Sequence, residues 1–325
     1  MAKTLEEHYS YLSDATKIER YRAAIGKAVR PGDVVVDLGC GTGLLGLMAL
    51  EAGAGKVYFV EEGSIIEVAR KTIANAGFED KAEFFKQNSF ELVLPEKADV
   101  IVCDHVGFFA FDYGILALLA DAKDRFLKPG GVMIPTSFDL KLAPVESEES
   151  RKLVGQWQNG SVPDEFSWLA ATSANTKHAV QLKSDELIAE IATLQSLSLG
   201  QDSPAFLSTS TEFQCIRDGV VDGLAGFFEC RLFDDVTMTN SPAADDAIER
   251  PQAFLPLETT AEVRKGDTIT ATVMARPEDS LIAWVVEFPA SGERFEYTTF
   301  NGLLLDQSML TMAQPNRVAN LNDQG

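Results

Sequence analysis

The chain has 325 residues, of which 46% are hydrophobic, and its 49 acidic and 28 basic side chains give a net charge of −21 at pH 7. Such an excess of acid disfavours nucleic acid as a partner, because nucleic-acid affinity comes largely from lysines and arginines that neutralise phosphates. No run of about 18 apolar residues predicts a membrane span, and the first residues lack the apolar core of a signal peptide. We therefore expect a cytoplasmic protein. Its charge either attracts a basic peptide or cationic small molecule, or simply keeps the protein soluble.

Cysteines and histidines are few and widely separated. Neither a CxxC pair nor a cluster with the spacing of metal ligands occurs among them, so we expect no structural metal site and no disulfide framework. The residues concerned are Cys40, Cys103, Cys215, Cys230, His8, His105 and His178.

The first part of the chain alternates between two periodicities. Residues 1–25 are expected to be helical, because apolar residues recur there every three to four positions. Short apolar strands then alternate with amphipathic stretches from residue 33 to residue 143. This alternation predicts a parallel sheet covered by helices on both faces. The expected helices are residues 44–53, 64–77 and 114–126.

The pattern of apolar and polar residues changes after about residue 144. Short and often alternating segments, among them SWLAATS and TITATVMAR, are separated by turns such as RKGD. This pattern predicts a second domain rich in strands, with a helical insert near residues 184–195. The fold class is therefore α/β, with a Rossmann-like parallel-sheet domain at residues 31–143 and a β domain at residues 144–325.

A glycine-rich turn follows the first strand of the parallel sheet. The dinucleotide pattern GxGxxG fails there, because Leu44 stands where the third glycine would be needed, and no GK[ST] of a phosphate-binding loop follows. What remains is D-x-G-x-G-x-G, in which Asp37 precedes Gly39, Gly41 and Gly43. Glycines in this position let the backbone approach a ligand closely.

Polar side chains follow the ends of several strands of the predicted sheet. Asp37 can accept a hydrogen bond from an amino-acid ammonium, and Glu61 ends the next strand, where a carboxylate can accept the hydroxyls of a ribose. Because the carboxyl ends of parallel strands meet at one edge, we expect Asp37, Glu61, Asn88 and Asp104 to converge there. A ribose joined to an amino acid indicates S-adenosylmethionine as the cofactor and S-adenosylhomocysteine as its product.

Residues 33–143 resemble the class I S-adenosylmethionine-dependent methyltransferases, and the likeness narrows to the protein arginine methyltransferases. Before this domain, His8, Tyr11, Leu12, Asp14 and Lys17 are similar to that family's H-x-x-M-L-x-D-x-x-R segment. The resemblance implies that residues 1–30 form a helical lid over the cofactor. Lys17 stands where the family has an arginine that holds the methionyl carboxylate, so it keeps the charge but not the bidentate fork; a solvated helix face is the alternative role for Lys17.

The candidate cofactor-binding residues combine the residue-based and the family-based arguments. The family's glutamate near the adenine aligns with Phe90, which leaves Asn88 or Ser89 and backbone groups to recognise that ring. The full candidate set is His8, Tyr11, Lys17, Asp37, Gly39, Cys40, Gly41, Thr42, Glu61, Glu62, Asn88 and Ser89.

The resemblance extends through the second domain to about residue 290. It implies a β-barrel-like substrate domain at residues 144–325, with a dimerisation arm near residues 150–180 and hence a homodimer. Four apolar residues of this stretch form either an interface or part of the core. They are Trp157, Phe166, Trp168 and Leu169.

The loop CDHVGFFAFDYG departs from the family's paired glutamates. Asp104 matches the first glutamate but is shorter, and Tyr113 occupies the second position, with Asp112 one residue earlier. Asp112 either replaces the second glutamate or caps a helix in solvent. His105, which replaces a tryptophan, is either a base near neutral pH or a packing residue. Asp104, Asp112 and His105 are the candidate catalytic residues.

A second departure lies in the β domain. The family's T-H-W segment aligns with Ile248, Glu249 and Arg250, so its histidine is absent. We therefore expect a methyltransferase similar to the protein arginine N-methyltransferases, which acts on a nitrogen of a protein, a peptide, or a guanidine or amine. A small-molecule O- or N-methyltransferase and a catalytically silent cofactor-binding scaffold remain as alternatives.

Overall fold

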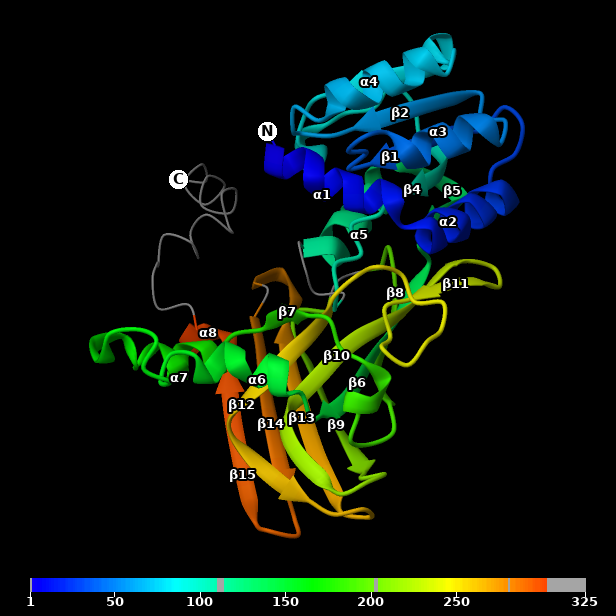
Figure 1. Cartoon of the computed structure of the whole chain (residues 1–325). Coiled ribbons are helices and arrows are strands. Elements are labelled where there is room, and N and C mark those ends of the chain that lie inside the picture. Colours follow the sequence, from blue (N-terminus) through cyan, green and yellow to red (C-terminus); the bar gives the residue numbers. More distant parts are fainter. Residues whose placement is uncertain (1, 110–113, 202–203, 280, 303–325) are drawn as a thin grey trace, which may run out of the picture.

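In a computed structural model of the chain, the described residues are 2–109, 114–201, 204–279 and 281–302. They form a parallel-sheet domain above an antiparallel domain, from which an arm of two helices projects (Figure 1). Within the described residues, no helix combines the length and apolar character needed to cross a membrane.

The parallel sheet has the strand order β3-β2-β1-β4-β5. Its strands are β1 Val34–Leu38, β2 Lys56–Val60, β3 Ala82–Phe85, β4 Ala98–Val102 and β5 Leu127–Ile134. The five residues of β1 are all buried, as expected for a central parallel strand. The predicted Rossmann-like domain is confirmed by this order.

Helices connect these strands and pack on the sheet. Their bounds are α3 Leu44–Glu51, α4 Ile66–Asn75 and α5 Ile115–Phe126. The expected helices are therefore present, each slightly shorter than its predicted range. α3 packs against β1 and β2, α4 against β2 and β3, and α5 against β4 and β5.

The order of the strands reverses at β1. β1 pairs with β2 on one side, where Leu38 lies opposite Val60, and with β4 on the other, where Asp37 lies opposite Val102. In open α/β sheets, ligands bind outside the carboxyl ends of the strands at such a switch point. The register therefore brings the residues that follow β1, β2 and β4 to one edge.

The N-terminal segment, expected to be helical, forms two helices. α1 Ala2–Ser13 and α2 Ala15–Ala28 meet at Asp14, whose carboxylate accepts a hydrogen bond from the backbone N–H of Lys17 and caps α2. α2 packs on α3 and also on strands of the antiparallel domain. This segment therefore joins the two domains along one side of the cleft.

The antiparallel domain consists of two sheets, with strand orders β7-β12-β10-β6-β8 and β15-β14-β13-β9, and β11 paired with β10. Trp284 is fully buried here, and its indole N–H donates to the carbonyl of Pro256. The strands of the first sheet are β6 Ser137–Val145, β7 His178–Val180, β8 Ala192–Ser198, β10 Gly219–Phe233, β11 Val236–Thr239 and β12 Gln252–Val263. The strands of the second sheet are β9 Leu207–Gln214, β13 Thr268–Arg276, β14 Leu281–Phe288 and β15 Glu293–Thr298. The short helix α8 Thr299–Gly302 follows the second sheet.

Two local expectations for this domain were wrong. The segment SWLAATS, expected among the strands, contributes to helix α7 Leu169–Ala174, which pairs with α6 Glu148–Gly155. The insert at residues 184–195 contains only one 3-10 turn, Ser184–Glu186, before β8 begins at Ala192. Its apolar residues Leu187 and Ile188 are buried in bridging contacts with the sheet, and this packing decides against a helix.

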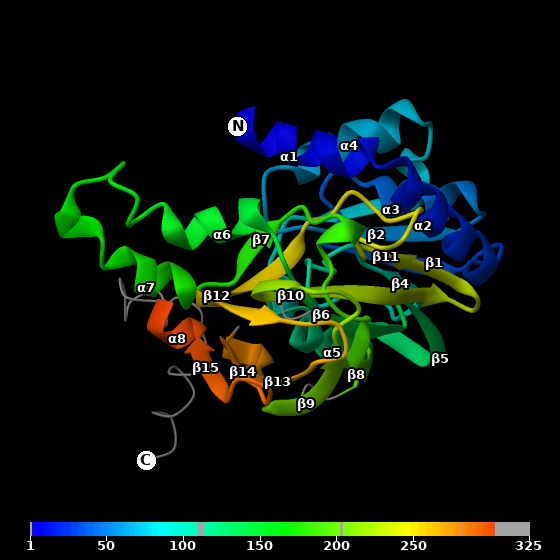
Figure 2. The same ribbon diagram turned by 60° about the horizontal axis from the view of Figure 1, so that its bottom comes forward.

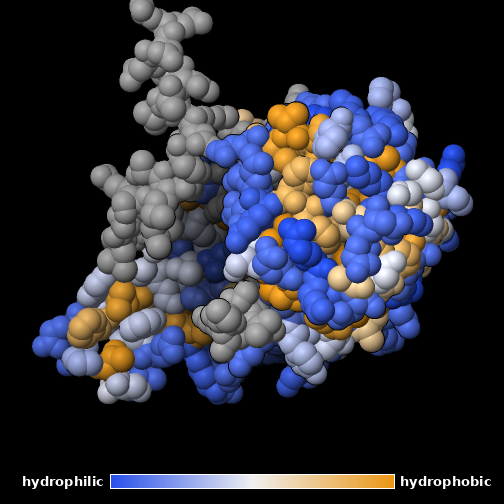
Figure 3. Space-filling view, turned by 90° about the horizontal axis from the view of Figure 1, so that it is seen from above, coloured by the Kyte–Doolittle hydropathy of each residue, from blue (hydrophilic) through white to orange (hydrophobic). Residues whose placement is uncertain are grey.

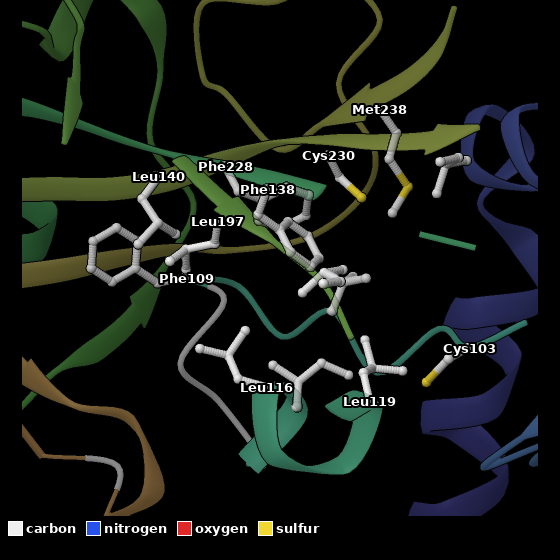
Figure 4. Close-up of a cluster of buried hydrophobic side chains, with 14 of the residues drawn as sticks. Cys103, Phe109, Leu116, Leu119, Phe138, Leu140, Leu197, Phe228, Cys230 and Met238 are labelled. Carbon is white, nitrogen blue, oxygen red and sulfur yellow. The ribbon is translucent and has the colours of Figure 1, made fainter. Parts of the chain in front are cut away.

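A hydrophobic core joins the two domains. Leu116 and Leu119 of α5 point toward Phe138, Leu197 and Phe228 of the antiparallel sheet (Figure 4). All five side chains are almost completely buried. Burial of this kind, worth roughly 1.5–3 kcal/mol per large apolar side chain, fixes the antiparallel domain beside the edge of the parallel sheet.

α6 and α7 lie in the arm that projects from the antiparallel domain (Figure 2). Phe166 and Trp168, in the segment between these helices, are each about half exposed, at 50% and 51%, whereas Trp157 packs against the core. Seen from above, hydrophobic residues lie among hydrophilic ones on the arm, at the lower left of Figure 3.

Candidate active site

A cavity of about 270 Å³ opens at the carboxyl ends of the strands. It lies between the glycine-rich turn, the two N-terminal helices and the segment that precedes β12. The residues that line it are His8, Tyr11, Leu12, Lys17, Ile18, Tyr21, Asp37, Gly39, Cys40, Gly41, Thr42, Leu44, Leu45, Met48, Glu61, Asp104, His105 and Arg250.

The glycine-rich turn forms the floor of this cavity. Gly39 and Gly41 both have positive φ values, 67° and 51°, which favour glycine. A side chain at Gly39 would clash with the ring of His105, and a Cβ at Gly41 would lie 3.1 Å from His8 Cε1. The sequence therefore needs glycine here for both conformation and space.

Asp37 is the second-last residue of β1, beneath the turn, and is almost completely buried. Its Oδ2 accepts a hydrogen bond of 2.7 Å from the backbone N–H of Gly46 in α3. Burial outweighs this bond and raises the pKa of Asp37 to about 7. The carboxyl group can therefore gain or lose its proton near neutral pH, in a position suited to a ligand ammonium.

Glu61 follows β2 and is held by two backbone groups. Its Oε2 accepts from the N–H of Gly41 at 3.2 Å, and its Oε1 accepts from the N–H of Gly63 at 2.7 Å. These bonds aim the carboxylate at the cavity and leave lone pairs for ligand hydroxyls.

Asp104 follows β4 and is held by two cations of the chain itself. Lys17 Nζ lies 2.7 Å from Asp104 Oδ2, and an Arg250 guanidinium nitrogen lies 3.3 Å from Asp104 Oδ1. Both cations also lie over the ring of Tyr11, with Lys17 Nζ at 4.8 Å and Arg250 Cζ at 5.3 Å from its centroid. Lys17 is buried and Asp104 partly exposed, so the carboxylate faces the cavity with its charge neutralised.

His105 lies beside Asp104 with its ring against Gly39. Its Nδ1 is 3.7 Å from Cys103 Sγ. Burial raises the pKa of the Cys103 thiol to about 12, which keeps that thiol neutral and unreactive. The backbone carbonyl of Cys103 accepts a hydrogen bond from the buried hydroxyl of Tyr21, so α2 holds this loop directly.

This set of groups fits an adenosyl amino acid. Lys17 offers a cation for a carboxylate, Asp37 a partner for an ammonium, and Glu61 acceptors for ribose hydroxyls. The uncovered backbone of the glycine turn and apolar residues such as Leu45 and Met48 complete a cavity without a phosphate-binding loop.

Two family models match the chain on either side of this cleft. "Methyltransferase small domain" matches residues 26–138, and "PRMT5 oligomerisation domain" matches residues 154–298. Protein arginine N-methyltransferase 1 of Chlamydomonas reinhardtii is 27% identical over 83% of this chain and 80% of its own length. Protein arginine N-methyltransferase 6 of Danio rerio is 38% identical over 42% of this chain and 40% of its own length.

The chain is similar to the protein arginine N-methyltransferases across both of its domains. Solved structures agree with this in fold. A Trypanosoma brucei PRMT1 enzyme-prozyme heterotetrameric complex with AdoHcy matches with a TM-score of 0.80 and 21% identity, over 90% of this chain and 96% of that one. Arabidopsis thaliana protein arginine methyltransferase 10 matches with a TM-score of 0.78 and 21% identity, over 90% and 97%. The class I methyltransferase fold with an antiparallel second domain is therefore confirmed.

The structure gathers most of the residues predicted for a methyltransferase site around the cavity. The predicted residues that line it are His8, Tyr11, Lys17, Asp37, Gly39, Cys40, Gly41, Thr42, Glu61, Asp104 and His105. Asp112, the candidate for the family's second acid, lies outside the described residues.

Three predicted cofactor-binding residues do not line the cavity. Asn88 Nδ2 donates to Glu62 at 3.1 Å, and Asn88 Oδ1 accepts from the backbone N–H of Phe90, so its side chain is used to form the short turn Ser89–Glu91. Asn88 therefore lies beside Glu62, the neighbour of Glu61 in the chain, and its part in binding the cofactor stays a prediction. Its side-chain oxygen is engaged locally, because an asparagine before a turn binds the turn's own backbone.

Sequence reasoning did not assign a role to Arg250, although it forms part of this methyltransferase cleft. The backbone N–H of Glu249, next to it, donates to Asp14 Oδ2 at 2.9 Å, and Asn240 Nδ2 donates to the carbonyl of Pro251 at 2.7 Å. Asp14 and Asn240 are both buried, so the segment is fixed from two sides. The sequence signals were its alignment with the family's T-H-W segment and its place just before an apolar strand, and neither identifies a partner 146 residues away.

Proposed function

We propose that this protein transfers a methyl group from S-adenosylmethionine to a guanidinium nitrogen of arginine in a protein or peptide. The observation that supports this most strongly is a carboxylate, Asp104, at the mouth of a cleft whose other groups suit an adenosyl amino acid. The relatives, named as protein arginine N-methyltransferases, support the same acceptor. The net charge of −21 favours a basic acceptor.

In this proposal, the N-terminal helices and the strand ends hold the cofactor. Lys17 binds the carboxylate of its amino-acid part, Asp37 binds the ammonium, and Glu61 binds the ribose hydroxyls. When bound, the cofactor supplies an electrophilic methyl group on a positively charged sulfur. The apolar lining of the cleft, which includes Leu45 and Met48, excludes water from the site.

Asp104 has two tasks in the reaction. It accepts hydrogen bonds from guanidinium N–H groups and so orients one nitrogen toward the methyl group. A guanidinium stays protonated at neutral pH, so the nitrogen that receives the methyl group must also release a proton. We assign acceptance of that proton to Asp104. His105, the second candidate, lies beside it against the glycine turn.

Labelled methyl donor tests the proposal directly. The protein is incubated with an arginine-rich peptide mixture and, separately, with a small-molecule filtrate of cell extract. We expect label in arginine of the peptide. Asp104→Asn should lower the rate at least about a hundredfold, and His105→Asn by less, because a positioned base contributes about 10² to 10⁴ in rate. Label in the filtrate alone would overturn the protein or peptide acceptor.

We also propose that the protein is a homodimer formed through the arm. Phe166 and Trp168 are two large aromatic residues, each about half exposed, on the same projecting arm, where they offer apolar surface to a second copy of the chain. The family model that matches residues 154–298 carries the description of an oligomerisation domain, which supports the same assignment.

A further inference from the structure

We propose that Arg250 is a built-in guanidinium competitor at the acceptor carboxylate and so raises the intrinsic affinity that an acceptor needs. It weakens every guanidinium ligand by the same factor, and peptide arginines, which make contacts beyond the guanidinium, still bind where free arginine and small guanidines do not. This inference rests on the proposed function, because it takes Asp104 to be the carboxylate that receives the acceptor.

The guanidinium of Arg250 occupies the carboxylate to which an acceptor arginine would bind. One terminal nitrogen lies 3.3 Å from Asp104 Oδ1 and 3.2 Å from the Asp104 carbonyl oxygen, and the other lies 3.4 Å from the carbonyl oxygen of Gly107. Its planar group also lies over the ring of Tyr11. The side chain is only 12% exposed, so it is part of the cleft wall and not a solvated surface arginine.

Both oxygens of Asp104 are thereby engaged by cations of this chain. Lys17 contacts Oδ2 and Arg250 contacts Oδ1. Binding of the cofactor carboxylate to Lys17 would draw this lysine toward the methyl donor and free Asp104 Oδ2. The contact between Arg250 and Asp104 Oδ1 would remain. An incoming guanidinium must therefore displace Arg250 or share Asp104 with a second positive charge.

The segment that carries Arg250 is held firmly. Gln252 Nε2 donates to the carbonyl oxygens of Asn240 and Arg250, and the Glu249 N–H donates to Asp14. Gln252 and Asn240 are buried. Displacement consequently requires rotation of the Arg250 side chain and not a movement of its backbone, so the competition is between two guanidinium groups for one carboxylate.

The competition has a simple consequence for affinity. If Arg250 covers Asp104 in about nine of ten molecules, the apparent affinity for an acceptor falls about tenfold, because only the competent fraction binds. This factor is the same for a small guanidine and for a peptide arginine. Only the peptide adds contacts from flanking residues, so it binds at concentrations at which a small guanidine does not.

Peptide binding tests this without requiring turnover. The probes are a fluorescent peptide that contains one arginine, its twin with neutral citrulline at that position, and methylguanidine as a displacing ligand. Affinities are measured by fluorescence anisotropy with saturating S-adenosylhomocysteine for the full-length protein, Arg250→Met, Arg250→Lys and the exposed control Arg294→Met. S-adenosylhomocysteine affinity and the thermal midpoint of each variant are recorded alongside.

We expect Arg250→Met to bind the arginine peptide about tenfold more tightly, to bind citrulline peptide unchanged, and to be displaced by methylguanidine at about tenfold lower concentration. In turnover assays its KM for the peptide should fall while kcat changes less than threefold. Arg250→Lys, which keeps the charge but not the planar fork, should be intermediate, and Arg294→Met should match the parent.

Weaker or unchanged arginine-peptide binding in Arg250→Met with normal S-adenosylhomocysteine affinity would overturn the inference, and would mean that Arg250 only orders the loop or binds an anionic acceptor. The same conclusion would follow if neither protein bound the peptide. Tighter peptide binding in Arg250→Met without transfer of label would leave the inference standing and overturn the proposed function instead. If Arg250→Met is unfolded, Arg250→Lys alone decides by the same measurements.

Discussion

Lys17 and Asp104 are 87 positions apart in the chain, yet Lys17 Nζ lies 2.7 Å from Asp104 Oδ2. One residue belongs to helix α2 and the other follows strand β4, so the ion pair joins the N-terminal helices to the edge of the parallel sheet. In the function proposed above, the same lysine serves the cofactor and the same carboxylate serves the acceptor. The two binding steps are therefore linked through a single contact.

Substitution of Lys17 tests its part in cofactor binding. Lys17→Met should raise the dissociation constant of S-adenosylhomocysteine about tenfold to a hundredfold, since a hydrogen bond to a charged group contributes about 1.5–3 kcal/mol. Lys17→Arg should retain affinity, because it keeps the charge and adds a fork suited to a carboxylate. Calorimetric titration measures both, with Lys27→Met, at an exposed ion pair, as control. An unchanged constant in Lys17→Met would remove Lys17 from the cofactor site.

The raised pKa of Asp37, about 7, predicts a pH-dependent affinity. Below pH 7 the carboxyl group is protonated and cannot pair with the ligand ammonium. S-adenosylhomocysteine should therefore bind up to about tenfold more tightly for each pH unit from 5.5 to 7, and affinity should level off above that. Asp37→Asn should bind more weakly at high pH and show a flat profile. A parent profile without this rise would contradict the assigned contact.

As pH rises, the raised pKa of Asp37 makes the folded protein less stable, although cofactor binding becomes stronger. Because the pKa of Asp37 is higher in the folded protein than its ordinary value near 4, the folded state holds the extra proton between about pH 4 and pH 7. The contribution of Asp37 to the free energy of unfolding is therefore largest at low pH and declines as pH rises through about 7. Comparison of the parent with Asp37→Asn across this range isolates the effect.

Asp14 is predicted to stabilise both domains at once. Its Oδ1 accepts from the Lys17 N–H and its Oδ2 from the Glu249 N–H, and it is 3% exposed. Asp14→Ala should lower the free energy of unfolding by about 2 kcal/mol, from a lost helix cap and an unpaired buried amide. Denaturant unfolding measures this loss. Asp14→Asn, which keeps one acceptor, should lose about half as much, and equal loss in both variants would show that only the charge matters.

If the arm forms the proposed dimer, substitution of its exposed aromatic residues should halve the molecular mass in solution. Paired substitution of Phe166 and Trp168 by serine should convert a dimer into a monomer in light-scattering measurements, because both side chains are half exposed on one protomer. Val93→Ser, at an apolar residue that is 85% exposed on the parallel-sheet domain, is the matched control and should leave the mass unchanged. A parent protein that is monomeric at micromolar concentration would contradict the proposal.

The parallel-sheet domain was readable from the sequence because its signals are local. Buried strands such as Val34–Leu38 are continuous apolar runs, and the glycines of the turn need positive φ values that other residues avoid. Asp37 and Glu61 were found for the same reason, since each lies at the carboxyl end of a buried strand. Helix α7 and the residues after Ser184 were misread, because their form is decided by packing against distant strands.

The contacts of the site were less predictable than its members. The strand-end position predicted Asp104 in the cleft and the family resemblance implied Lys17 there, but neither indicated that the two residues contact each other. Arg250 reaches Asp104 only because buried Asn240 and Gln252 fix the segment before β12. These are contacts between single side chains far apart in the sequence, and the spacing of apolar residues along the chain does not predict them.

The central claim is that the cleft at the ends of β1, β2 and β4 binds an adenosyl amino acid and not a dinucleotide or a triphosphate. Calorimetric titration of the purified protein with S-adenosylhomocysteine, NADH and ATP tests this most directly. We predict saturable binding of S-adenosylhomocysteine that Glu61→Ala weakens, and no comparable binding of the other two. Saturable heat with NADH or ATP, and none with S-adenosylhomocysteine, would contradict the account.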